Sequence, residues 1–320
     1  MLRYIVRRIL WGILMLAIVS ALIFVIFYVF PTADPATLRA GRNASPKQIE
    51  IIRHALGLDE PVYTQYWDYM KGIVLHFDFG YSYQSNADVR TLIFDRLPAT
   101  IWLVTGAAIL WLLIGIPVGI ISAVKRRSLL DRSTMVTTLA FISAPVFWLG
   151  LVSLYLFAQG VGQLQIFPGQ GAYITANTIP QKMEAMILPW LVLAAASAAI
   201  YARYLRSSMI DTMAEDYIRT ARAKGLLERR VIMRHGVRSA ITPIVTLLGL
   251  DIGVLLAGNA ILTESVFVIP GVGRLVFTSI ERSDLPVIQG VVIFGAFFII
   301  LFNLIVDIAY AYLDPRVRYR

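Results

Sequence analysis

The stretch LPATIWLVTGAAILWLLIGIPVGIISAV, residues Leu97–Val124, contains no charged side chain. A helix needs about 20 consecutive apolar residues to cross the roughly 30 Å hydrocarbon core of a bilayer. Because lipid offers no hydrogen-bond partners, the backbone of such a run must satisfy its own polar groups, and a helix does so. This stretch therefore predicts a transmembrane helix and an all-α integral membrane protein.

Five further runs resemble this stretch in length and apolar composition. Three carry no charge, and two carry one internal acid, Asp251 or Asp307. The five runs are Leu10–Phe30, Met135–Gln159, Ala185–Ala202, Ala240–Leu262 and Pro286–Tyr312. The first follows basic residues, as a signal peptide would, but it exceeds the roughly 7–15 apolar residues of a cleavable signal, so we expect a retained anchor. The sequence thus predicts six transmembrane helices.

The composition of the whole chain points to the same class of protein. Hydrophobic residues make up 58% of the 320 residues and charged residues 15%, with a mean hydropathy of +0.70. Soluble domains carry roughly 45–50% apolar and about 25% charged residues. The sequence contains no cysteine, which excludes disulfides, thiolate nucleophiles and cysteine metal sites.

The net charge of +9 is distributed unevenly along the chain. Nineteen of the 29 Lys and Arg residues fall in segments that face the cytoplasm if the N-terminus does. Cytoplasmic loops of membrane proteins carry such an excess of basic residues. We therefore expect both termini inside, and the positive charge needs no nucleic-acid partner to explain it.

Three regions follow from this topology: an anchor span in residues 1–30, an extracytoplasmic helical domain in residues 31–96, and a five-span core in residues 97–320. In the outer domain, Ser45 followed by Pro46 is typical of a helix start. A second helix is indicated by an amphipathic stripe, and a third is expected at Val89–Leu97. The stripe consists of Tyr63, Tyr66, Trp67 and Met70. This domain either packs on the membrane core as a cap or offers a docking surface to an outside partner.

Residues 203–238, which we call the basic loop, connect the fourth and fifth predicted spans. DTMAEDYIRTARAK, Asp211–Lys224, favours a helix that ends at Gly225, and LLERRVIMRH, Leu226–His235, favours a second one. Two basic amphipathic helices can lie flat on anionic lipid headgroups. Alternatively, they form a knob that docks into a cytoplasmic partner, with Ala221, Ala223 and Gly225 as its slim tip and Leu226 and Leu227 as its apolar anchor.

The basic loop resembles a known family. YIRTARAKGLLERRVIMRHGVRSAITPIV, Tyr217–Val245, is similar to the conserved cytoplasmic loop of ABC importer permeases of the dipeptide/oligopeptide permease family. Matching segments occur in the same order along the rest of the chain. They are the N-terminal RYIVRRI, DRLPAT (Asp95–Thr100), VFVIPGVGRL (Val266–Leu275), ERSDLPVIQG (Glu281–Gly290) and NLIVDIAYAYLDPR (Asn303–Arg316). The resemblance therefore covers essentially the whole chain.

The resemblance implies a multi-pass subunit of a bacterial or archaeal cytoplasmic membrane. Its partners would be a second, homologous permease subunit, two ABC ATPase subunits and an extracytoplasmic solute-binding protein. ATP and Mg²⁺ would be bound by the ATPase subunits, since this sequence contains no G-x-x-x-x-G-K-[ST]. The chain itself would bind no cofactor and would not be an enzyme, and membrane lipids would surround it.

The resemblance also assigns a candidate ATPase-coupling site within the basic loop, centred on Gly225. The site consists of Arg219, Thr220, Ala221, Arg222, Ala223, Lys224, Gly225, Leu226 and Leu227. The general importer motif has Glu-Ala-Ala where this chain has Arg219, Thr220 and Ala221. The form found here is similar to the peptide-permease version, so the departure from the general motif points to the peptide-permease subfamily.

Two acids within predicted spans are further candidates for function. Asp251 lies about 16.5 Å along its span from the first residue, at 1.5 Å per residue, and so near the midplane. It either lines the translocation path, where it would attract the amino group of a solute, or bonds to the partner permease. Asp307 lies near the inner surface, where a structural cap or an interhelical pair is expected.

The function expected from these features is that of a permease subunit forming a path for dipeptides or oligopeptides. Members of the same family carry other solutes, so glutathione, a nickel chelate or a sugar is an alternative. Two more distant alternatives are a secondary transporter driven by an ion gradient, for which the sequence offers no clear internal repeat, and a membrane anchor that transports nothing.

Overall fold

The computed structural model describes residues 2–29, 34–41, 44–55, 57–82 and 84–313. In this part of the chain nearly all regular structure is helical, and the one sheet is a hairpin of two strands with two residues each. The predicted all-α class is confirmed, whereas the count of six spans and the orientation of the termini stay predictions. Phe30, the predicted end of the first span, and the C-terminal Arg316, Arg318 and Arg320 lie outside the described residues.

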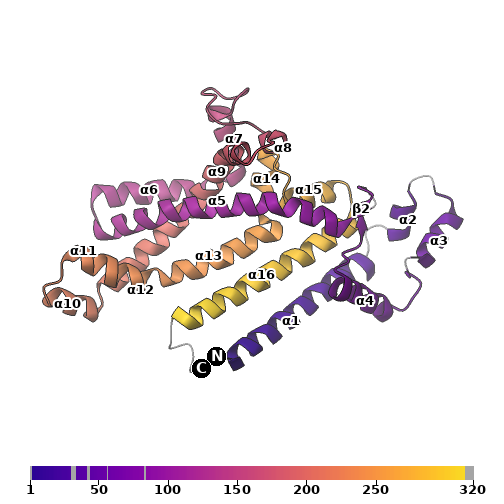
Figure 1. The fold of residues 1–320 in the computed structure, drawn as a ribbon, viewed down its shortest axis with the longest axis horizontal. Helices are drawn as coiled ribbons and strands as arrows, with labels where there is room; N and C mark the ends of the chain where they lie inside the picture. The colour runs from indigo at the N-terminus through magenta and orange to yellow at the C-terminus, as the bar shows by residue number, and fades with distance from the viewer. Residues whose placement is uncertain (1, 30–33, 42–43, 56, 83, 314–320) are drawn as a thin grey trace.

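Five of the described helices are long and apolar enough to cross a membrane, and two bent helix pairs raise the number to seven if each pair is one span. The five are α1 (Leu2–Phe24, continued by the π-helical turn η1, Val25–Val29), α5 (Val89–Val124), α9 (Ile179–Met213), α13 (Thr242–Val254, continued by η4, Leu255–Asn259) and α16 (Leu285–Leu313). Figure 1 shows them running roughly side by side, with α10 and α11 at one end of the molecule and α2 to α4 at the other.

The predicted span Met135–Gln159 is not one straight helix. It consists of α6 (Leu129–Ser143) and α7 (Val146–Phe157), which meet at an angle of 102°. Pro145 follows the break, and the residue before a proline is driven out of the helical region. Ala144 accordingly has an extended backbone, with φ −80° and ψ 125°. The hydropathy of the run predicted its length, whereas the proline determined its shape.

A second bent pair begins where the sequence predicted the end of span five, at Leu262. Helices α14 (Ile261–Phe267) and α15 (Val272–Glu281) meet at 84°. The connection contains Val268, which has a left-handed backbone, and Pro270. The prediction of a single span ending at Leu262 was therefore incomplete, because the chain continues as this bent helix pair before α16.

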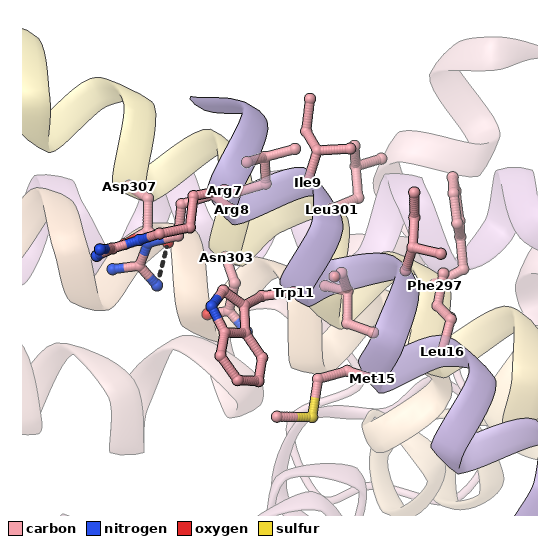
Figure 2. Close-up of a pocket in the computed structure, with 14 residues that line it drawn as sticks. Arg7, Arg8, Ile9, Trp11, Met15, Leu16, Phe297, Leu301, Asn303 and Asp307 are labelled. Atoms are coloured by element: carbon pink, nitrogen blue, oxygen red, sulfur yellow. Dashed lines mark ion pairs between the residues drawn. The ribbon is translucent and has the colours of Figure 1, made fainter. Parts of the chain in front are cut away.

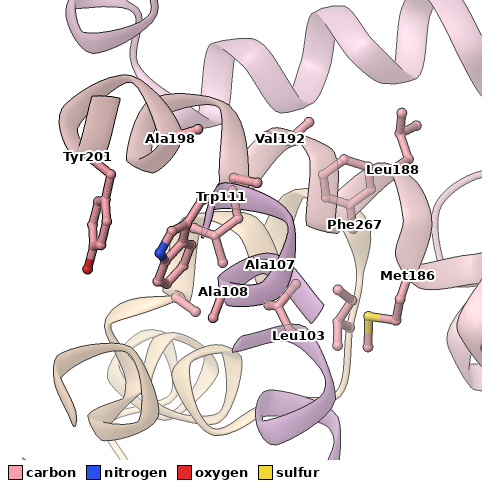
Figure 3. Packing of buried hydrophobic residues seen from close by; sticks show 14 of the residues in the cluster. Leu103, Ala107, Ala108, Trp111, Met186, Leu188, Val192, Ala198, Tyr201 and Phe267 are labelled. Atoms are coloured by element: carbon pink, nitrogen blue, oxygen red, sulfur yellow. The ribbon is translucent and has the colours of Figure 1, made fainter. Parts of the chain in front are cut away.

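The most extensive helix contact among the described residues is between α5 and α9. A Cβ atom at Gly115 or Gly119 would lie 2.9 Å from the carbonyl oxygen of Ala198 or Ala202, respectively, so these backbones approach closely only because the glycines have no side chain. Small residues serve this purpose between membrane helices, where the hydrophobic effect contributes little to association. Beside this contact the buried Trp111 ring lies 5.7 Å from the ring of Tyr201 (Figure 3).

The outer domain is a chain of short elements. They are α2 (Pro35–Ala40), α3 (Pro46–Ala55), α4 (Val62–Lys71), η2 (Gly72–His76), and the hairpin of β1 (Tyr81–Ser82) and β2 (Ala87–Asp88). The predicted start at Pro46 is confirmed, and the Ser45 hydroxyl accepts a hydrogen bond from the Gln48 amide at 3.4 Å. The expected third helix, Val89–Leu97, is instead the first part of α5, because its pattern runs without interruption into the apolar stretch.

The predicted stripe on α4 is divided between two faces. Tyr66 faces α1, where its hydroxyl lies 3.0 Å from that of Ser20 and its ring 5.3 Å from Phe24. Tyr63 and Trp67, by contrast, are 77% and 69% exposed. The helix therefore contacts the anchor span through one side and presents two aromatic rings on the other.

Candidate coupling loop and buried charge sites

The basic loop is folded, with different helix boundaries from those predicted. Helix α9 continues to Met213, and after a turn at Ala214 and Glu215 a new helix, α10 (Asp216–Ala223), begins. The predicted single helix Asp211–Lys224 was therefore wrong. Beyond Gly225 the chain continues as α11 (Glu228–Arg230), the π-helical η3 (Val231–Val237) and α12 (Arg238–Ala240), which leads into α13.

Gly225 forms the turn between the two halves of the loop. Its φ of +73° is in the left-handed region, which glycine adopts without the steric cost that most side chains incur, and its amide donates to the Arg222 carbonyl at 2.9 Å. No atom lies within 4 Å of the position that a Cβ would occupy. The predicted helix end at Gly225 is confirmed to within one residue, and the glycine sits on an open surface.

The loop has a small hydrophobic core of its own. Ile218, Ala221 and Val231 are buried, and Met213 and Leu226 pack against them. Of the residues predicted to form the tip and anchor, Ala221 and Leu226 therefore face inward and hold the loop together. Leu227 is 79% exposed and is the apolar side chain that remains for a partner.

An ion pair joins the two sides of the Gly225 turn. Arg222 Nε and Nη2 donate to the two carboxylate oxygens of Glu228 at 3.1 and 2.8 Å. These hydrogen bonds lower the pKa of Glu228 and raise that of Arg222 relative to their ordinary values. Both side chains are about half exposed, so water screens the pair and its net contribution to stability is about 0.2–1 kcal/mol.

The surface around the turn is basic. The exposed members of the predicted site are Arg219, Thr220, Arg222, Ala223, Lys224, Gly225 and Leu227, and the next residues, Arg229 and Arg230, are also exposed. Arg219 has one acidic neighbour, Asp216, at 3.3 Å. A basic knob with one exposed leucine can bind an acidic protein cleft or anionic headgroups, so both interpretations of the loop are compatible with its geometry.

A buried ion pair fixes the base of this loop to the rest of the molecule. Asp131 of α6 is 3% exposed and accepts hydrogen bonds from Arg206 Nε and Nη2 of α9 at 2.7 and 2.8 Å. The Ser122 hydroxyl and the Arg127 amide also donate to the Asp131 carboxylate, at 2.5 and 2.9 Å. The two Arg206 hydrogen bonds therefore tie α6 to the last part of α9, and the other two hold Asp131 within the α5–α6 turn. Sequence reasoning missed this site, because its partners are distant along the chain.

Asp251 has a partner within its own chain. Its carboxylate accepts a hydrogen bond from the Tyr201 hydroxyl at 2.7 Å, which joins α13 to α9. Tyr201 is buried, whereas Asp251 is half-buried. The sequence interpretation considered the solute path and the partner permease, and the structure adds this third contact. The nearby Trp111 indole N–H is buried and has no hydrogen-bond partner among the described residues.

Glu264 is a buried carboxylate that sequence reasoning did not single out. It is 0% exposed, accepts a hydrogen bond from the Thr100 hydroxyl at 2.7 Å and another from the Arg274 amide at 2.8 Å. The Val272 amide in turn donates to the Thr100 hydroxyl at 2.9 Å. The Glu264 carboxylate of α14 thus caps the first turn of α15, where the helix dipole favours negative charge. An acid two residues before the matched VFVIPGVGRL segment was the available signal.

Asp307 forms the interhelical pair that was expected of it. Its carboxylate lies 2.9 Å from Arg8 Nη1, which joins α16 to α1. Within the part of the chain that the structure describes, no group of three His, Cys, Asp or Glu side chains is arranged to hold a metal ion. The charged sites of this molecule join helices to one another.

Comparison with known proteins places this architecture in a family. Residues 115–319 match the binding-protein-dependent transport system inner membrane component, and residues 1–104 match the N-terminal part of such membrane components. The chain is 41% identical over 320 residues to the glutathione transport system permease protein GsiC of Escherichia coli (strain K12), with both chains covered completely. The proteins of the same name from Shigella dysenteriae serotype 1 and Shigella flexneri serotype 5b match with the same identity and coverage. The chain therefore belongs to the binding-protein-dependent inner membrane components and is a permease subunit of an ABC importer, with the ATPase activity in separate subunits.

Proposed function

We propose that this permease subunit forms, with a second permease, the membrane path for glutathione or a peptide of similar size. The observation that carries the proposal is the 41% identity along the entire chain to permeases named for glutathione transport. It favours the glutathione alternative of the sequence analysis over dipeptides and longer oligopeptides. Glutathione is itself a tripeptide, so the family resemblance and the relatives' names point to chemically similar solutes.

In this proposal the basic loop docks into an ATPase subunit. Its support is the combination of a local hydrophobic core, the Gly225 turn and the exposed Leu227 within a basic surface. Movement of the ATPase subunits would move the loop, and the pair of Asp131 and Arg206 would carry α6 along with α9. The membrane helices then alternate between two packings, as alternating access requires.

Asp251 is the proposed contact for the amino group of the solute. It is the acid that lies deep within α13, its carboxylate is only half-buried, and the Tyr201 hydroxyl holds it in place. A carboxylate in this setting attracts a cationic group while its neighbour fixes its orientation. The unpartnered Trp111 N–H lies beside the same tyrosine and is a second candidate donor.

Uptake of radiolabelled glutathione tests the proposal. The complete transporter would be expressed in cells that lack their own glutathione and peptide importers, and unlabelled dipeptides, tripeptides and longer peptides would compete. We expect ATP-dependent uptake that glutathione inhibits most strongly. Preferential inhibition by longer peptides would instead restore the oligopeptide interpretation, and uptake of neither would contradict the proposed solute class.

The Asp251→Asn variant tests the solute contact separately. We expect weaker transport of solutes with a free amino group and little change for an N-acetylated competitor, because only the former loses an ionic partner. Asp307→Asn is the matched control, since that acid pairs with Arg8 at 2.9 Å. An equal loss of uptake for both kinds of solute would assign Asp251 a structural role.

A further inference from the structure

A pocket of about 650 Å³ lies between the anchor helix α1 and the last helix α16, on the side where α1 begins. Figure 2 shows side chains of both helices lining it, with the two arginines of α1 close to Asp307 and apolar side chains further along the helices. The pocket is separate from the basic loop and from Asp251, so the proposed transport mechanism does not use it.

The lining of this pocket changes from polar to apolar along its length. Its polar end contains Arg7, Arg8, Asn303 and Asp307, and the remaining lining is almost entirely apolar. Since Asp307 pairs with Arg8 at 2.9 Å, one acid faces two guanidinium groups and the end has a net positive charge. Arg7 is exposed, and no carboxylate lies within ion-pair distance of it in the described part of the chain.

The dimensions of the pocket match one leaflet of a bilayer. From Arg7 to Leu16 the helix rises about 13.5 Å at 1.5 Å per residue, close to half of a hydrocarbon core about 30 Å thick. Trp11 lies one turn beyond Arg7 and is 54% exposed, and amphipathic aromatic rings are typical of the interface between headgroups and chains. Leu16 and Phe297 lie at the far end and also line a neighbouring apolar cavity of about 470 Å³.

From this geometry we propose that the groove between α1 and α16 binds one anionic phospholipid of the cytoplasmic leaflet. The Arg7 guanidinium holds the phosphate by paired N–H donors, a geometry for which arginine is suited. An acyl chain follows Trp11 and Met15 toward Leu16 and Phe297. The Arg8–Asp307 pair keeps the two helices at the spacing that the lipid requires. The lipid thereby fastens α1, which is mostly exposed along its length, to the permease core.

Charge complementarity is what selects this occupant over others. A second permease subunit would have to present an acidic group at the same depth to satisfy Arg7, and a zwitterionic lipid would bring its own positive charge close to both guanidinium groups. An anionic headgroup supplies negative charge at the polar end, and its chain supplies the apolar surface. Each nearby Lys or Arg attracts such a lipid by an amount that corresponds to about a fivefold change in binding.

Native mass spectrometry of the purified full-length chain, alone and in its transporter complex, tests the proposal. The probes are phosphatidylglycerol and phosphatidylcholine with identical acyl chains. We expect one phosphatidylglycerol to be retained preferentially, and Arg7→Gln to weaken its retention about fivefold. The matched control is Arg126→Gln, which removes an exposed arginine from the turn after α5, outside the groove. Membrane abundance of each variant would be measured first.

A second variant tests the apolar part of the site. Met15→Trp fills the groove but leaves the arginines in place, and we expect it to reduce retention of phosphatidylglycerol, whereas Arg7→Lys retains most of it. Equal retention of the two lipids, or equal effects of Arg7→Gln and Arg126→Gln, would show non-specific annular lipid and overturn the proposal. So would a cross-link from position 11 to the second permease subunit with no lipid retained in the complex.

Discussion

Two regions of the molecule are held together in opposite ways: the α5–α9 helix contact and the basic loop. The helix contact depends on glycines that bring two backbones together, and its neighbours are buried rings and aliphatic side chains. The loop depends on a core of three buried residues, one glycine turn and one exposed ion pair. The first cannot change shape without losing packing, whereas the second can be altered at its surface without disturbing the membrane helices. Rigid span packing and a loop with a small core of its own suit a subunit that is driven from outside the bilayer.

The strongest test of this division is Gly225→Glu. A glutamate cannot adopt a φ of +73° without strain, and it adds bulk and negative charge to the proposed docking surface. We expect uptake to fall to background while abundance in the membrane stays normal. Gly225→Asn is the matched control, because asparagine tolerates the left-handed region, and it should retain most activity. Normal uptake by the glutamate variant at normal abundance would remove the docking assignment.

The Asp131–Arg206 pair joins α6 to the part of α9 that leads into the basic loop, so it connects the two regions. Removing one partner of a buried ion pair typically costs about 3–5 kcal/mol, because the other charge stays buried. Asp131→Asn should therefore lower both thermal stability in detergent and transport per ATP hydrolysed. In a double-mutant cycle, Asp131→Asn with Arg206→Gln should be little worse than either change alone. Strictly additive losses would mean that the pair does not act as a unit.

Overpacking the helix contact is expected to have a smaller effect, confined to stability. A Cβ at Gly119 would lie 2.9 Å from a backbone oxygen of α9, which cannot rotate away, so Gly119→Ala should cost about 1–3 kcal/mol. At Gly72 the nearest atom would be 3.8 Å away, and Gly72→Ala serves as the control. Thermal unfolding followed by size-exclusion chromatography would measure both. Equal midpoints would contradict the close packing of α5 and α9.

The smallest effect concerns the pH dependence of the loop. The pKa of Glu228 is lowered in the folded protein, so its pair with Arg222 stabilises the loop above the unfolded pKa of about 4.3, and this contribution is lost as pH falls through the lower, folded pKa. Hydrogen exchange in residues 226–231, corrected for intrinsic rates, should increase in acid by at most about fivefold. Glu228→Gln should show the faster exchange already at pH 7. Unchanged exchange in that variant would make the pair irrelevant to the loop.

Sequence reasoning predicted the membrane class and the basic loop because both follow from local composition. A charge-free run such as Leu97–Val124 has few alternatives to a helix in lipid. The bend between α6 and α7 was missed because a proline changes the direction of a run without changing its hydropathy. The Asp251–Tyr201 hydrogen bond joins residues from different helices, and no local pattern reveals such a pair.

Glu264 was missed for a related reason. Near the end of an apolar run a single acid looks like the first polar residue of a loop, and only the fold places Thr100 and the start of α15 around it. The same limit applied to Leu226, which was assigned to an exposed anchor although it packs against the loop core. Composition shows that a side chain is apolar, but the partner that covers it depends on the fold.

The buried position of Glu264 also has a consequence for biogenesis. Thr100 is synthesised 164 residues earlier, so one hydrogen-bond donor is already in the membrane when the carboxylate leaves the ribosome. The second donor, the Arg274 amide, follows ten residues later, and until α15 forms the acid is only partly satisfied. A chain that stalls or is misassembled between these points exposes a charge that lipid does not tolerate. The carboxylate therefore gains its full set of hydrogen-bond partners only when α14 and α15 are both in place.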